Sequence, residues 1–122
     1  MAKILIVDDE PSVLKFLGTR LTQKGYDVVL AEDGRKGLDC FLQDRPAVIV
    51  LDLKMPRMDG LTVLNQVRAL SPLQPVIVLT GGTDDATEEQ VRALGVTELV
   101  EKESAVSLLD AALKRVLVPD LC

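Results

Sequence analysis

Five polar residues, of types that bind metals or phosphate, lie at or just after the ends of short apolar runs. They are Asp8, Asp9, Asp52, Thr80 and Lys102. Carboxylate oxygens without histidine or thiolate suit a hard cation, and Mg²⁺ prefers one or two carboxylates together with water and phosphate oxygens. A hydroxyl and an ammonium group beside such a cation can bind an anion. The pattern therefore predicts phosphoryl-transfer chemistry.

The apolar runs predict the strands that must bring these residues together. The candidates are Ile4–Val7, Asp27–Leu30, Val48–Leu51, Val76–Leu79 and Val96–Val100. The first, third and fourth are continuously apolar and rich in β-branched residues, which is typical of strands buried on both faces. Segments with apolar residues three and four positions apart separate them and predict helices. This alternation predicts an α/β fold in which helices cover both faces of a parallel sheet.

The carboxyl ends of parallel strands share one edge of the sheet, where ligands bind near the reversal of strand order. If the first and third strands are neighbours, Asp8, Asp9 and Asp52 converge in one pocket. Carboxylates at short range raise one another's pKa unless a cation neutralises them. The sequence therefore predicts a divalent metal site at this edge.

A simpler interpretation stays open for each residue taken alone. Asp8 or Asp9 precedes the first predicted helix and can serve as its N-cap. Asp52 precedes a loop instead, so capping explains it less well. Thr80 is ordinary at a strand end and Lys102 is ordinary on a solvated surface. Independent caps and surface charges have no reason to collect at one edge, however, so the combination favours a functional site.

The composition excludes several classes of function. The chain has 122 residues, which suits one domain, and contains no histidine for a catalytic triad or a metal site. Its net charge of −5 disfavours nucleic-acid binding, which depends on phosphate contacts. Three aromatic side chains leave almost no ring for a flavin or a base to stack on. No apolar run is long enough for a signal peptide or a membrane span, and we expect a cytoplasmic location.

Four motifs, in order along the chain, resemble the receiver domain of two-component response regulators. They are Val7-Asp8-Asp9-Glu10, the stretch Leu-Asp-Leu-Lys-Met-Pro-Arg-Met-Asp-Gly over 51–60, Leu79-Thr80-Gly81, and Lys102. The resemblance covers essentially the whole chain and implies one receiver domain over 1–122, with 118–122 as an irregular tail. It implies a doubly wound, five-stranded parallel sheet in the flavodoxin-like order 2-1-3-4-5.

The resemblance also implies a role for each acidic residue. Asp52 would accept a phosphoryl group from a phosphohistidine on a sensor histidine kinase or a histidine phosphotransfer protein. Asp9 and Asp52 would bind Mg²⁺ directly, and Asp8 would act largely through water. The main-chain carbonyl of Lys54 would supply a further ligand. The protein would then be a phosphoacceptor that at most dephosphorylates itself slowly, and not an enzyme.

On the anion side, the resemblance implies that Thr80 donates to one phosphoryl oxygen and that Lys102 pairs with another. Two departures from the family pattern lie nearby. Lys102 is followed by Glu103 where the family usually has proline after a cis bond, and a cis bond without proline costs about 3 kcal/mol, so we predict a trans bond. Leu99 stands where the family commonly has Tyr or Phe, which predicts a changed or weakened output signal, or simply a core position.

The helix predicted over 84–94 is the least apolar, so we expect it to open most easily. Together with the fifth strand and the last helix it is the predicted output surface. A degenerate receiver that acts as a phosphorylation-independent interaction module remains an alternative, suggested by Leu99 and Glu103. An FMN carrier is disfavoured by the scarce aromatics and by the absence of a glycine-rich phosphate loop. An aspartate-nucleophile phosphatase would have a second aspartate at position 54, where this chain has lysine.

Overall fold

Five strands alternate with five helices in the structure, a computed structural model that describes residues 2–53, 55, 59–81, 85–96, 98–101 and 105–117. The strands are β1 (Lys3–Val7), β2 (Asp27–Ala31), β3 (Val48–Asp52), β4 (Val76–Thr80) and β5 (Glu98–Glu101). The helices are α1 (Pro11–Gln23), α2 (Gly34–Asp44), α3 (Gly60–Leu70), α4 (Asp85–Ala93) and α5 (Ala105–Leu117). No described helix combines the length and hydropathy that a membrane span needs.

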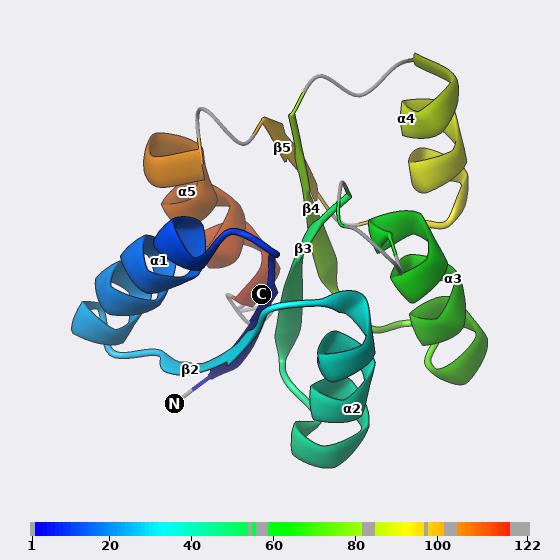
Figure 1. The fold of residues 1–122 in the computed structure, drawn as a ribbon. Coiled ribbons are helices and arrows are strands. Elements are labelled where there is room, and N and C mark those ends of the chain that lie inside the picture. Colours follow the sequence, from blue (N-terminus) through cyan, green and yellow to red (C-terminus); the bar gives the residue numbers. More distant parts are fainter. Residues whose placement is uncertain are drawn as a thin grey trace, which may run out of the picture.

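The strands form one parallel sheet in the order β2-β1-β3-β4-β5, which confirms the predicted fold class and order. Figure 1 shows α1 and α5 on one face and α2, α3 and α4 on the other. The direction in which strands are added reverses between β1 and β3. A crevice for ligands is expected beyond the carboxyl ends of these two strands.

Apolar side chains fill both spaces between the sheet and its helices. Buried residues under α1 and α5 include Leu17, Leu21, Leu109 and Leu113, and those under the other three helices include Leu38, Phe41, Val63, Leu64 and Val91. Every residue of β3 and β4 is buried, as their continuous apolar runs predicted. The core is thus almost entirely aliphatic, and it fixes the strands whose ends carry the polar residues.

The strand boundaries agree with the predicted ones to within one residue, except at the start of the last strand. The last strand begins at Glu98 and not at Val96, because the chain turns at Gly95 with a φ of 76° before the strand starts. The helix expected over 84–94 spans Asp85–Ala93, where Val91 is fully buried and Ala93 is exposed.

Arg68 of α3 connects this helix to the end of α4. Its guanidinium donates to the carbonyls of Leu94 at 2.6 Å and Gly95 at 3.0 Å, just beyond α4. It also donates to the carbonyl of Gln74 at 2.7 Å in the α3–β4 connection. A cation at these positions satisfies carbonyls that have no partner within a helix and complements the helix dipole. The carboxyl-terminal end of α4 is therefore held by α3.

Candidate metal site at the carboxyl edge of the sheet

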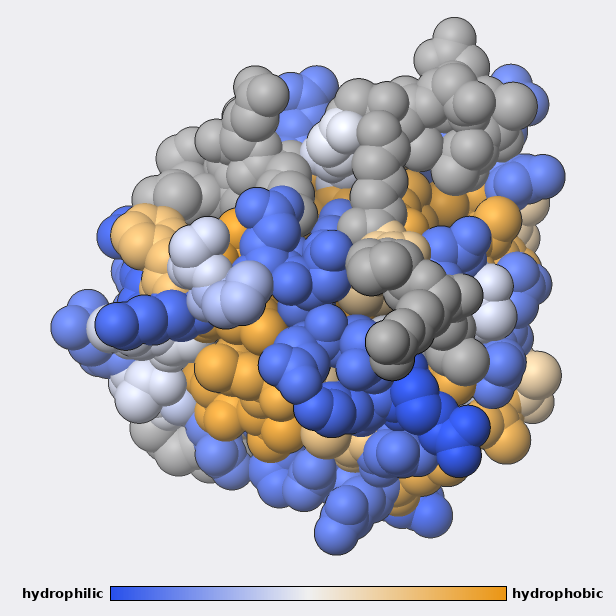
Figure 2. Space-filling view, in the orientation of Figure 1, coloured by the Kyte–Doolittle hydropathy of each residue, from blue (hydrophilic) through white to orange (hydrophobic). Residues whose placement is uncertain are grey.

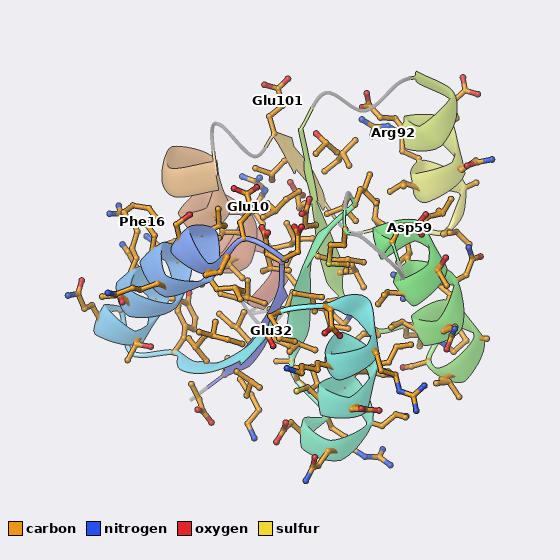
Figure 3. The ribbon with its side chains drawn as sticks, viewed as in Figure 1. Glu10, Phe16, Glu32, Asp59, Arg92 and Glu101 are labelled. Atoms are coloured by element: carbon orange, nitrogen blue, oxygen red, sulfur yellow. The ribbon has the colours of Figure 1, made fainter. Side chains whose placement is uncertain are left out.

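Three consecutive acidic residues form a cluster directly after β1. Each of Asp8, Asp9 and Glu10 offers a carboxylate oxygen, and these oxygens lie within 4.8 Å of one another. Asp8 is fully buried, Asp9 is half-buried and Glu10 is exposed. Figure 3 shows Glu10 at the carboxyl edge of the sheet, beside the start of α1. Such crowding of like charges is unfavourable without a cation, so the cluster is a candidate metal site.

Backbone contacts hold this cluster in place. The Asp8 N–H donates to the carbonyl of Ala31 at 3.1 Å, and the Asp8 Oδ1 accepts from the Glu10 N–H at 2.9 Å. The first helix begins at Pro11 with Glu10 as its N-cap residue, so neither aspartate is the N-cap. The capping interpretation of these two aspartates is therefore wrong. By contrast, Asp59 does cap its helix, since its Oδ1 accepts from the Thr62 N–H at 2.9 Å.

Asp52 lies on the neighbouring strand, at the same edge. It is the last residue of β3 and is only 2% exposed. The register pairs Val7 with Leu51, so Asp8 and Asp52 are the next residues along two adjacent strands. Side chains alternate between the faces of a sheet, which puts both aspartates on the face covered by α1 and α5. The condition for convergence, that the first and third predicted strands are neighbours, is met.

Thr80 ends β4 at the same edge and is buried, with 8% of its surface exposed. Asp52 pairs with Leu79, so Thr80 lies one position farther toward the open end of the sheet. Alternation turns Thr80 to the face covered by α3 and α4, the face opposite to that of Asp52. Leu99 pairs with Val78 on β5, shares the face of Thr80, and packs against the core there.

Two predicted site residues, Lys54 and Lys102, lie outside the described residues, as does the Lys102–Glu103 bond predicted to be trans. Glu10 is the member of the acidic cluster that the sequence analysis did not assign to the metal site. The signal that could have identified it is its position directly after Asp9, at the same strand end.

The donor set fits Mg²⁺ in kind. Each described candidate ligand, after β1 and at the end of β3, is a carboxylate, and Asp9 and Glu10 remain accessible to solvent. Mg²⁺ takes oxygen ligands, usually only one or two of them carboxylates, and keeps several waters. A buried carboxylate beside more exposed ones leaves room for such waters and for a phosphate oxygen.

Two hollows lie away from this edge. One, of about 530 Å³, runs between α1 and β2, where apolar surface gathers in Figure 2, and the other, of about 320 Å³, lies between the ends of α2 and α3. Of the residues that line them, only Lys15 in the first and Arg45 in the second are charged. Cys40 of α2 is half-buried, and burial, with Asp44 and Asp39 nearby, raises the pKa of its thiol. Among the described residues at these places, no group of carboxylates or thiols is close enough together to hold a metal.

A family model described as the response regulator receiver domain matches residues 4–114. A probable transcriptional regulator, ycf27 of Guillardia theta, is 42% identical over 115 residues, which cover 94% of this chain and 45% of that protein. The response regulator MprA of Mycolicibacterium vanbaalenii is 40% identical over 117 residues, which cover 94% of this chain and 50% of that protein. The chain thus spans about half the length of these relatives.

Solved structures show the same architecture. The chemotaxis protein CheY4 of Vibrio cholerae superimposes with a TM-score of 0.89 at 34% identity, covering 96% of this chain and 99% of that one. The response regulator TrrA of Thermotoga maritima, solved in complex with Mg²⁺–BeF, superimposes with a TM-score of 0.85 at 29% identity, covering 96% and 100%.

Proposed function

Since the chain belongs to the family of response regulator receiver domains, we propose that it is a signalling domain whose phosphoacceptor is Asp52. The observation that carries the proposal is the meeting of β1 and β3, which brings the acidic cluster and Asp52 to one edge of the sheet. A buried carboxylate beside other carboxylates at the reversal of strand order is arranged for a phosphoryl group and a cation.

In the proposed reaction the nucleophile is a carboxylate oxygen of Asp52. It attacks phosphorus in the phosphohistidine of a sensor kinase or a histidine phosphotransfer protein. The new O–P bond forms as the P–N bond breaks, and the imidazole leaves with the electron pair and takes a proton from solvent. The product is an acyl phosphate on Asp52, made without an acid or base from this chain.

The metal ligands in this proposal are Asp9 and Asp52, with Asp8 acting through water and the Lys54 main-chain carbonyl as a further ligand. Mg²⁺, when bound, neutralises charge that develops on the phosphoryl oxygens. Thr80 donates its hydroxyl to one of these oxygens and Lys102 pairs with another. The burial of Asp52 excludes bulk water from the nucleophile, which strengthens each of these interactions.

The direct test is the intact mass of the chain after incubation with a small acyl-phosphate donor, with Mg²⁺ or with EDTA. The proposal predicts the gain of one phosphoryl group with Mg²⁺ and no gain with EDTA. Absence of any gain at saturating Mg²⁺ would contradict it and favour the second candidate, a degenerate receiver that binds its partner without phosphorylation. Leu99, half-buried where the family commonly carries an aromatic ring, is the observation that favours that candidate.

The output surface in this proposal comprises α4, β5 and α5. Thr80 and Leu99 share the face covered by α4, so a shift of Thr80 toward the phosphoryl group leaves space that Leu99 can enter. Phosphorylation shifts the equilibrium between two conformations of this surface. The shift is only as large as the extra stabilisation that the phosphoryl group gives to one conformation over the other. The cytoplasm remains the predicted site of this signalling.

We expect phosphorylation to change amide hydrogen exchange in α4 and β5 more than in α2. The residues between 88 and 101 should exchange at altered rates with Mg²⁺ and an acyl-phosphate mimic, because the neighbouring Thr80 moves. Exchange in Gly34–Asp44 serves as the internal control. Equal exchange with and without the mimic across 88–101 would disprove this output surface.

A protein donor must contact the rim of the pocket, and Phe16 is an exposed apolar side chain nearby. Its surface is 50% exposed, and it lies six residues after Glu10 along α1, a rise of about 9 Å. Figure 3 shows it on the outer side of α1. We infer that Phe16 contacts the donor, which must bring its histidine to the end of β3.

Phe16→Ala should therefore lower the kcat/KM of phosphotransfer from the cognate protein donor about tenfold, because the variant no longer buries the ring against the donor. Phosphorylation by a small acyl phosphate should stay unchanged, since that donor touches no part of α1. Leu42→Ala is the matched control, because Leu42 is 56% exposed but lies on α2. If Phe16→Ala slowed both donors equally, or neither, the contact would be excluded.

A further inference from the structure

Gly60 lies against the backbone of Asp52 more closely than any side chain would permit. It is the first residue of α3, and a Cβ placed on it would lie 2.3 Å from the Asp52 carbonyl oxygen. The same Cβ would lie 2.6 Å from the Leu53 Cα. Both neighbours are main-chain atoms, so no rotation of a side chain relieves the overlap. Only a shift of α3 or of the end of β3 would make room.

The same contact closes the connection between β3 and α3. The Gly60 N–H donates to the Leu53 carbonyl at 2.9 Å, while the Asp59 carboxylate caps the first turn of the helix. On the other side, the Leu53 N–H reaches the Leu79 carbonyl only at 3.4 Å, a long hydrogen bond. The end of β3 is thus held by α3 as well as by β4.

We propose that Gly60 is a positioning residue that sets where Asp52 lies relative to the acidic cluster that follows β1. The proposal rests on the function proposed above, since it concerns the same metal site. The connection from 53 to 59 begins beside Asp52 and is closed by the Gly60–Leu53 hydrogen bond. A metal shared between two strands needs its ligands at a fixed separation, and residues that orient ligands affect affinity strongly.

Two other helical glycines show how the same glycine-to-alanine substitution meets different neighbours elsewhere in the chain. A Cβ on Gly37 of α2 would lie 2.9 Å from the Val7 methyl groups, and one on Gly18 of α1 would lie 3.2 Å from a methyl group of Leu30. The Leu30 methyl groups end a flexible side chain that is 44% exposed and can move, whereas Val7 is 1% exposed and directly precedes Asp8. Gly18 is therefore the matched control, and because alanine favours the helical state at both Gly60 and Gly18, the difference between the two variants isolates the contact with the site.

Mg²⁺ affinity of the folded protein, measured by calorimetry, tests the proposal. We expect Gly60→Ala to raise the Kd about tenfold or more, as loss of ligand-orienting contacts does. The Kd of Gly18→Ala for Mg²⁺ should stay within about twofold of the wild-type value, because Gly18 lies far from the site and acts independently of it. Equal affinities in Gly60→Ala and Gly18→Ala would overturn the proposal. If the wild type itself bound no Mg²⁺, the proposed function would fail, which is a separate result.

A second pair of variants decides the matter if Gly60→Ala does not fold. Asp59→Asn keeps a capping side chain at the start of α3, whereas Asp59→Ala removes it, and both remove the same charge. A frayed first turn loosens the Gly60–Leu53 hydrogen bond. We therefore expect weaker Mg²⁺ binding in Asp59→Ala than in Asp59→Asn. Equal binding would contradict the proposed role of α3.

Discussion

Asp52→Asn should abolish the gain of a phosphoryl group from both the small acyl phosphate and the protein donor. The amide has nearly the shape of the carboxylate, so the buried end of β3 keeps its packing. It lacks the anionic oxygen that attacks phosphorus and the charge that binds the cation. We expect complete loss of phosphorylation, measured as intact mass after incubation with donor and Mg²⁺.

The control for this loss is Asp27→Asn at the exposed start of β2, which removes the same charge at the opposite end of the strands. This variant should gain a phosphoryl group as the wild type does. If Asp52→Asn were phosphorylated on another aspartate at a comparable rate, Asp52 would not be the acceptor. The cluster after β1 would then be the place to search for it.

Mg²⁺ should stabilise the fold, and Asp9→Asn should remove most of that effect. A ligand at one hundred times its Kd adds about 2.7 kcal/mol to the free energy of unfolding when it binds only the native state. Without Mg²⁺ the variant should be at least as stable as the wild type, because three crowded carboxylates become two. Urea unfolding with and without Mg²⁺ measures both effects.

Glu32→Gln is the matched variant for the magnesium effect. Glu32 is exposed, follows β2 at the same edge of the sheet, and pairs with Lys36. Its replacement removes one charge without touching the acidic cluster, and the exposed pair with Lys36 contributes little to stability because solvent screens it. The variant should therefore keep its stabilisation by Mg²⁺. Full stabilisation of Asp9→Asn as well would exclude Asp9 as a ligand.

The sequence predicted the fold well because its signals are local. Continuous β-branched runs such as Val48–Leu51 suit only strands buried on both faces, and the helices between them show a clear period. The start of the last strand was misjudged because Val96 is apolar, whereas the turn at Gly95 decides where the strand begins. Apolar character alone does not report a change in backbone direction.

The candidate site was predictable as a set of strand ends, and less so in its details. The order of strands, which the family resemblance implied and no local pattern gave, brings Asp8 and Asp52 to adjacent strand ends. The register of β3 and β4 places Thr80 on the face opposite to that of Asp52. No local sequence pattern predicts this register. The close contact between Gly60 and Asp52 crosses a connection of seven residues, from 53 to 59. Such contacts depend on tertiary packing and were not predicted.

A crystal structure grown with Mg²⁺ and beryllium fluoride tests the central claim most directly. We expect a metal bound by carboxylates at the ends of both strands, Asp9 on the β1 side and Asp52 on the β3 side. We also expect the beryllium of the mimic on a carboxylate oxygen of Asp52, with a fluoride near the hydroxyl of Thr80. A metal held by Asp8, Asp9 and Glu10 alone, or none at saturating Mg²⁺, would contradict the account.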